Sequence, residues 1–383
     1  MTLHIFNPEH DIALASGLEI FTAPHAGRQL RHDLGWLPAI WADDGDVILV
    51  DDQAQAEKGL RQLQRRVFSL NAHSEQPKRS QRLTETLSAF STDVTDINPW
   101  GWNAALRLQL KKKGIDESLL PSKEQTEAIR QLSHRRVASA LLSNLIATYP
   151  QAPLIGKACE CTDSKQVEAL LAQWSKIVIK APWSSSGRGL RFVNQTDGMT
   201  VSTAGWLKNM LLQQKSVMLE PYYNKVKDIA MEFISDGKGH VSYLGLSLFH
   251  TANGAYTGNL LATERQKESM LANYLPTNLL EHVRQAICHE LGSVLGCKYE
   301  GPFGIDMMVV ANPDATSEKS LAADIEERQF LLHPCVEINL RRTMGHVALA
   351  LTRLINPQQD DERIRVMRIV YENNQYKLKI QAE

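Results

Sequence analysis

One stretch near the end of the chain constrains the fold most, because polar side chains recur there at every second position. From Val336 to Arg341 the residues alternate between apolar and polar. Successive side chains of a β-strand point to opposite faces, so Glu337, Asn339 and Arg341 share one face while the apolar residues share the other. The alternation predicts a half-buried strand that displays an acid, an amide and a guanidinium in a row.

An earlier apolar stretch carries a single acid, Asp306. Burying a carboxylate is costly unless it is paired or binds a cation. Together with Glu337 and Asn339, it supplies two carboxylates and an amide oxygen, a set that suits magnesium and leaves positions for water and phosphate oxygens. The alternative is a salt-bridged strand in which Asp306 bonds to Arg341 or Arg342.

A loop rich in serine and glycine lies between predicted strands at residues 177–180 and 190–193. Its small residues let backbone N–H groups approach phosphate oxygens, and Lys180 at the end of the incoming strand adds a positive charge. The lysine precedes the loop and a strand follows it, so the segment is not a Walker A loop. It is not a dinucleotide fingerprint either, because no G-x-G-x-x-G leads into a helix. A surface hairpin is the alternative.

A later strand ends at Glu220 and Pro221, and it has the character of a hinge. Its backbone could hydrogen-bond the edge of an adenine, and Asp228 could take the hydroxyls of a ribose. Each of these acids, taken alone, also fits a surface residue.

The composition excludes some classes of partner. The chain has 383 residues, with 42 Lys and Arg against 43 Asp and Glu, so no excess charge favours a nucleic-acid or anionic-membrane partner. No apolar run approaches the length that spans a bilayer, and the N-terminus lacks the basic region of a signal peptide. Five irregularly spaced cysteines fit free thiols in a reducing compartment. We therefore expect a cytoplasmic protein with no nucleic-acid and no membrane partner.

The first part of the chain alternates between strand and helix, which predicts an α/β domain with a parallel sheet. Strands are expected at 3–6, 47–50 and 93–98, and helices at 24–37, after 98 up to Lys113, from Ser122, and from Ser133 to before Pro150. Two polar clusters, Asn7–Asp11 and Asn98–Asn103, follow predicted strands. Ligands of open α/β sheets bind at the carboxyl ends of strands, so both clusters are candidates for function, with turn chemistry as the alternative.

Taken together and in this order, the motifs resemble the ATP-grasp superfamily of carboxylate–amine ligases. The resemblance covers roughly residues 133–351 and rests on Lys180, Glu220, Asp306 and the strand that ends at Arg341. It implies two α+β subdomains that clamp ATP, preceded by an N-terminal α/β domain. The implied units are an N-terminal domain at 1–120, linking helices at 121–150, a lid subdomain at 151–225, and a core subdomain with the metal site at 226–383.

The resemblance also implies a role for each motif residue. ATP would contact Lys180, Ser185, Ser186, Gly187, Gly189, Glu220, Pro221, Tyr222 and Asp228, and the metal ligands Asp306, Glu337 and Asn339 would hold one or two magnesium ions, or manganese. The catalytic residues would be Lys180, Arg341 and Arg135. Arg341 would face the transferred phosphoryl group. Arg135 occupies a position where such proteins often have a phosphate-binding lysine, and arginine keeps the charge with a different reach.

Enzymes of this kind transfer the γ-phosphoryl group of ATP to a carboxylate, and an amine or thiol then attacks the acyl phosphate. We therefore expect a ligase that acts on small-molecule carboxylate and amine substrates, and homodimers are common among such proteins. Candidate substrate contacts are His250, Tyr256 and Asn259 in a glycine-rich segment, whose alternative is a hairpin turn, together with Arg188. An ATP-dependent phosphotransferase and a non-catalytic ATP-binding regulatory protein remain the alternative functions.

Overall fold

The first part of the chain folds around a four-stranded parallel sheet with strand order β3-β2-β1-β4. Its strands are β1 (Thr2–Ile5), β2 (Val47–Leu49), β3 (Arg82–Thr84) and β4 (Asp96–Pro99), and the helices around it are α1 (His10–Ser16), α2 (His25–Leu34), α3 (Gln53–Leu70) and α4 (Ala104–Lys112). Strand β2 is apolar and buried throughout, as expected of a parallel strand that is covered on both faces. The predicted N-terminal α/β domain is therefore confirmed.

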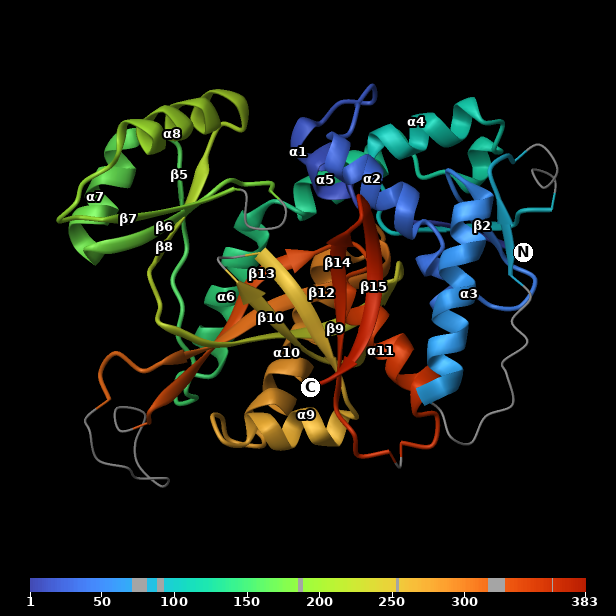
Figure 1. The fold of residues 1–383 in the computed structure, drawn as a ribbon. Helices are drawn as coiled ribbons and strands as arrows, with labels where there is room; N and C mark the ends of the chain where they lie inside the picture. The colour runs from blue at the N-terminus through green and yellow to red at the C-terminus, as the bar shows by residue number, and fades with distance from the viewer. Residues whose placement is uncertain (71–80, 88–92, 185–188, 253–254, 316–327, 360) are drawn as a thin grey trace.

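These coordinates form a computed structural model that describes residues 1–70, 81–87, 93–184, 189–252, 255–315, 328–359 and 361–383. Two helices, α5 (Lys123–Leu132) and α6 (Arg135–Thr148), connect the N-terminal domain to the rest of the chain (Figure 1). Ser122 and Gln125 form a capping box at the start of α5, which confirms the predicted helix start at Ser122. Helix α6 buries Leu141, Leu142 and Leu145 in the core of the second half.

A small antiparallel sheet forms the lid subdomain. Its order is β5-β8-β6-β7, with β5 (Cys159–Cys161), β8 (Val217–Pro221), β6 (Lys176–Lys180) and β7 (Leu190–Asn194), and it carries helices α7 (Ser164–Trp174) and α8 (Val201–Gln213). Lys180 pairs with Leu190, so β6 and β7 form the predicted hairpin. The predicted loop residues Ser185, Ser186, Gly187 and Arg188 lie outside the described residues.

A seven-stranded antiparallel sheet forms the core subdomain, in the order β13-β12-β9-β10-β11-β14-β15. The elements are β9 (Lys225–Asp236), β10 (Val241–Ala252), β11 (Ala255–Leu261), α9 (Glu264–Leu271), α10 (Leu279–Leu295), β12 (Glu300–Ala311), β13 (Phe330–Asn339), α11 (Met344–Ile355), β14 (Arg365–Glu372) and β15 (Gln375–Ala382). Ile229, Met231 and Phe233 of β9 pack with α10 in one apolar core. The alternate residues of β9 face α11 on the other side.

The last two strands join the core sheet to the N-terminal domain. Arg66 of α3 donates to the carbonyl of Ile380 at 2.8 Å, and the backbone N–H of Tyr376 donates to Asp33 at 2.8 Å. Figure 1 shows β15 beside α2 and α3, with α11 nearby. The observed architecture confirms the predicted pair of α+β subdomains behind an α/β domain. None of the helices in the described ranges has the length and apolar character needed to cross a membrane.

Candidate functional site

The predicted metal ligands come together on two neighbouring strands. Antiparallel pairing of β12 and β13 places Asp306 opposite Glu337 and Gly304 opposite Asn339. Because Glu337 and Asn339 are two residues apart, they share a face with Asp306. The alternation read from the sequence therefore predicts this face correctly. Within the described residues no group of three or more His, Cys, Asp or Glu side chains is placed to hold a metal. The predicted oxygen set consists of two carboxylates and one amide.

The electrostatics of Asp306 reflect a concentration of negative charge. Removal from water, followed by the nearby carboxylates of Glu337 and Glu232, raises the pKa of Asp306 to about 7. Arg341 and a hydrogen bond with Asn339 oppose this rise without cancelling it. Opposed carboxylates with too little positive charge around them are what a divalent cation would stabilise.

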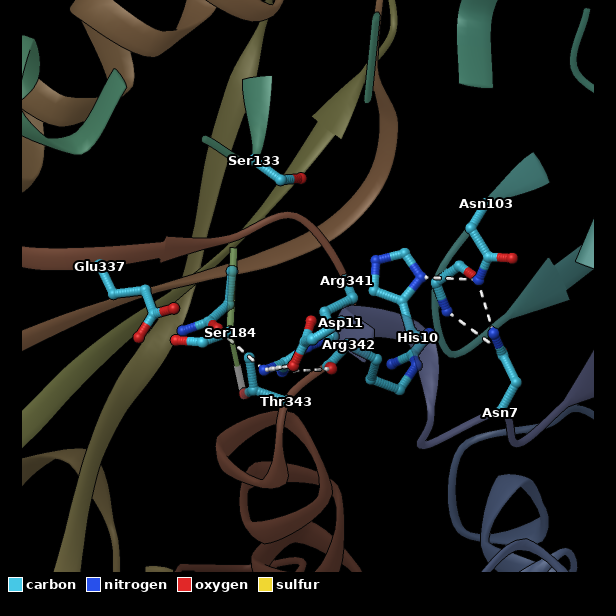
Figure 2. Close-up of polar contacts among 12 residues, drawn as sticks. Asn7, His10, Asp11, Asn103, Ser133, Ser184, Glu337, Arg341, Arg342 and Thr343 are labelled. Carbon is cyan, nitrogen blue, oxygen red and sulfur yellow. Dashed lines mark hydrogen bonds and ion pairs between the residues drawn. The ribbon is translucent and has the colours of Figure 1, made fainter. Parts of the chain in front are cut away.

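Arg341 forms its ion pair with Asp11 of the N-terminal domain. Its Nε and Nη2 atoms each lie 2.8 Å from an oxygen of Asp11, and Nη2 also donates to Asn339 Oδ1 at 2.9 Å. Arg342 turns toward the same domain, where its backbone N–H donates to the carbonyl of Trp100. The alternative prediction, a salt bridge from Asp306 to Arg341 or Arg342, is therefore not what the structure shows. Both arginines instead contact the N-terminal domain. The cause is that β13 ends directly against that domain (Figure 2).

Arg135 joins the lid to the face of β12 and β13 that carries the predicted metal ligands Asp306, Glu337 and Asn339, called here the metal face. As the first residue of α6, it lies 2.8 Å from Glu337 Oε1 through Nη2. Its Nε donates to the carbonyl of Ala181 at 3.0 Å, and Nη2 reaches Ser184 Oγ at 3.3 Å. The side chain is buried, and it joins the end of β6 to β13. The arginine thus occupies the junction between the helix, the lid and the core.

Lys180 and Glu220 form a buried ion pair inside the lid. Their nearest N and O atoms are 2.6 Å apart, and their side chains are 6% and 7% exposed. Besides the effect of burial, Glu220 raises and Lys180 lowers the pKa of both His333 and Cys335 on β13, so the pair is near this strand of the core sheet. Asp306 and Glu337 also affect Cys335. The Lys180–Glu220 pair and the carboxylates of Asp306 and Glu337 therefore lie around the same strand, β13.

The remaining predicted ATP contacts lie around this pair. A Cβ on Gly189 would lie 2.3 Å from the Cβ of Ser184, so the base of the loop accepts only glycine there. Pro221 is the last residue of β8. The Lys176 ammonium lies over the ring of Tyr222, 3.5 Å from its centroid, in a cation–π contact.

Asp228 lies on the same sheet face as Asp306, because it pairs with Met308. Its Oδ2 atom is held by Lys225 at 2.6 Å and by Thr251 at 2.7 Å.

The predicted substrate contacts separate into two places. The Tyr256 hydroxyl donates to Asn259, and Asn259 Nδ2 donates to Ser247 Oγ at 2.7 Å. Phe249 pairs with both Asn259 and Asp228, and paired residues of neighbouring strands lie on the same face. This chain of polar side chains therefore lies on the same sheet face as Asp228. His250 follows Phe249, so it is exposed on the opposite face.

The structure also brings the two N-terminal clusters, Asn7–Asp11 and Asn98–Asn103, into contact. The sequence predicted each cluster separately and did not predict that they touch. Asn7 donates to the carbonyl of Gly101 at 2.9 Å and accepts from its N–H at 3.3 Å. His10 lies 3.2 Å from Asn103 through Nδ1 and Nδ2 (Figure 2). The signal was present, because the clusters follow β1 and β4 and these strands are neighbours.

The buried acid Glu232 of β9 was not among the predicted site residues. Its Oε2 accepts from Thr343 Oγ1 at 2.8 Å and lies 2.9 Å from His346 Nδ1 at the start of α11. A Cβ on Gly345 would collide with its carboxylate, so glycine is required there. The signal that identified Asp306, a lone acid within an apolar stretch, is also present around Glu232 between Ile229 and Ile234.

A small cavity opens where the three units meet. It is lined by His10, Asp11, Ser133, Ser184, Glu337 and Asn339, among others. These residues come from the N-terminal domain, the C-terminal end of α5, the lid and the core. The cavity therefore lies beside the metal face and is partly closed by residues that the lid contributes.

Comparison with known proteins gives similarities of overall arrangement. No protein-family model and no curated protein matches the sequence. Among solved structures, N5-carboxyaminoimidazole synthetase from Staphylococcus aureus has a TM-score of 0.47 at 10% identity, covering 97% of this chain and 83% of that one. Biotin carboxylase from Campylobacter jejuni has a TM-score of 0.49 at 11% identity, covering 96% and 75%. With TM-scores below 0.5, these similarities assign no role to any residue, and the site rests on its own geometry.

Proposed function

We propose that this protein is an ATP-dependent ligase of the ATP-grasp kind. It would join a carboxylate to an amine or thiol through an acyl phosphate and release ADP and phosphate. The observation that carries the proposal is the row formed by Asp306, Glu337, Asn339 and Arg341, which faces the junction of three structural units. That junction is where a triphosphate, a metal and a second substrate would meet.

The donor set fits magnesium, or manganese, better than a softer metal. Carboxylate and amide oxygens are hard ligands, and phosphate oxygens and water would complete the coordination. Asp306, Glu337 and Asn339 would hold the metal, whose positive charge would offset the repulsion that raises the pKa of Asp306. One oxygen of Glu337 already meets Arg135, which leaves the other for the metal.

The nucleotide would lie between the lid and the core sheet. Lys180 would contact its phosphates, the backbone around Glu220 its base, and Asp228 its ribose. Support comes from the buried Lys180–Glu220 pair, whose charges act on the core strand β13. Phosphoryl transfer spreads charge over the moving group, so cations that are already in position, such as Arg341 and Arg135, would stabilise its transition state. The lid would exclude water from the acyl phosphate.

We also infer that the substrates are small molecules, that the protein is cytoplasmic, and that it forms a homodimer. All five cysteines are free, which agrees with a reducing compartment. The narrow cavity beside the metal face supports a small acyl donor.

The test combines a product screen with one substitution. Small carboxylates are paired with amines in the presence of MgATP, and ADP release and amide formation are measured by mass spectrometry. Glu337→Gln should weaken MgATP binding by about tenfold or more, because a charged ligand is lost. The exposed acid Glu372 provides a matched control through Glu372→Gln, which should bind as wild type does. Unchanged magnesium-dependent affinity in Glu337→Gln would contradict the metal site, and a stable phosphorylated product would favour a phosphotransferase.

A further inference from the structure

The imidazole of His10 is buried and held in one orientation. It is 1% exposed, and a Cβ on Gly101 would lie 2.6 Å from its Nδ1 atom, so the ring packs directly on the glycine backbone. Its Nδ1 atom lies 3.2 Å from Asn103 Nδ2. Burial, the largest influence, lowers the pKa of His10 to about 4, and Arg341 lowers it further, whereas Asp11 and the backbone of Gly101 raise it. The ring is therefore neutral near pH 7.

The cap of α4 determines which nitrogen of His10 carries the proton. Asn103 is the N-cap residue, and its Oδ1 accepts from the backbone N–H of Leu106 at 2.9 Å. This bond fixes the amide so that its NH2 group faces His10. An NH2 group only donates, so Nδ1 must accept and the proton of the neutral ring lies on Nε2.

The Nε2–H group of His10 has no hydrogen-bond partner within the described residues. Figure 2 shows this nitrogen on the side of the ring that faces Ser133, which lines the same cavity. Both oxygens of Asp11 are bound by Arg341. The hydroxyl of Ser133 already donates to the carbonyl of Ile129 at 2.7 Å. The cavity thus presents a buried donor that lacks an acceptor.

We propose that this cavity binds the carboxylate of the acyl donor, with one carboxylate oxygen accepting a hydrogen bond from His10 Nε2–H. The inference rests on the proposed ligase function and specifies where its first substrate binds. An anionic oxygen matches the free donor and gains from the neighbouring Arg341 guanidinium. An ammonium group would need a free acceptor, but both Asp11 oxygens are engaged by Arg341, one Glu337 oxygen is engaged by Arg135, and the other is assigned to the metal in the proposed ligase. The site would place the carboxylate beside Asn339 and Arg341, where the γ-phosphoryl group is expected.

The test uses sodium formate as the probe and the full chain loaded with MgADP. Long-range 1H–15N spectra report the tautomer of each histidine, and the signals that His10→Phe removes identify His10. Asn103→Asp keeps the helix cap, but at pH 8.5 its second oxygen accepts the proton of Nδ1, which turns Nε2 into an acceptor. Asn278→Asp, at the N-cap of the distant α10, is the matched control.

In wild type and Asn278→Asp, His10 should show the Nε2–H tautomer, and formate should shift its signals in a saturable manner. Formate affinity should fall by about ten- to hundredfold in Asn103→Asp, the effect of losing one hydrogen bond to a charged group. Equal shifts with sodium chloride or methylammonium, an Nδ1–H tautomer in wild type, or unchanged affinity in Asn103→Asp would overturn the inference. MgATP affinity is measured on the same samples to keep the two proposals apart. If the ligase proposal is wrong, wild type should fail to bind MgATP, whatever the formate result.

Discussion

Replacing Asp306 with asparagine should stabilise the protein and remove its magnesium-dependent nucleotide binding. Removal from water and the carboxylates of Glu337 and Glu232 raise the pKa of Asp306 from 3.8 to about 7. Between these two values the folded state binds a proton that the unfolded state has released. Stability therefore falls as pH rises through this window, and the loss is complete above the folded pKa.

The size of the effect follows from the pKa difference. A carboxyl group with this displacement costs the folded state at most about 4 kcal/mol above pH 7. Asp306 is only half-buried, so solvent screening brings the expected value to about 2 kcal/mol. Asparagine carries no charge and keeps an oxygen for Asn339. The variant should therefore match wild type near pH 4 and exceed its stability by about 2 kcal/mol at pH 8.

Urea unfolding at pH 4.5 and pH 8 in EDTA measures this difference. Asp197→Asn, at an exposed turn of the lid, is the control and should show no pH-dependent gain. Magnesium with ADP should then stabilise wild type but not Asp306→Asn, because the cation favours the charged carboxylate. The reasoning is refuted if Asp306→Asn has no larger advantage over wild type at pH 8 than at pH 4.5.

Three further substitutions test the ion pairs of the site. Lys180→Met should lower the free energy of unfolding by about 3–5 kcal/mol, because it leaves Glu220 buried and unpaired. Adding Glu220→Met should restore most of the stability but not MgATP affinity, as measured by urea unfolding and calorimetry; a double variant as unstable as the single one would contradict this. Asp11→Asn should reduce kcat for ADP release by about ten- to hundredfold, because Arg341 loses its fixed position. MgATP affinity should stay within about twofold, and an equal loss in both quantities would show that Asp11 acts on ATP binding.

The sequence predicts the parts of the fold that depend on local patterns. Alternation along the last motif strand placed Glu337 and Asn339 on one face, and a single acid in an apolar strand identified Asp306. The strand on each side of the serine and glycine loop predicted the lid hairpin. Each of these signals extends over a few residues, so it does not require knowledge of distant partners.

The parts that sequence reasoning missed depend on register and on distant contacts. His250, Tyr256 and Asn259 were grouped because they are close in sequence, yet the face of each is set by the pairing of β10 with its neighbours. A bulge between His250 and Thr251 shifts that pairing. Nor does any local pattern indicate that Asp11 would bind Arg341, since the two residues are 330 positions apart.

The bond between Asp11 and Arg341 has a consequence for synthesis of the chain. Asp11 is translated early, and the parallel sheet around it is complete before the second half of the chain exists. Until Arg341 leaves the ribosome, the carboxylate at that sheet edge has no guanidinium partner. The final geometry of the cavity is therefore set late in translation, when the end of β13 docks against the first helix of the chain, α1.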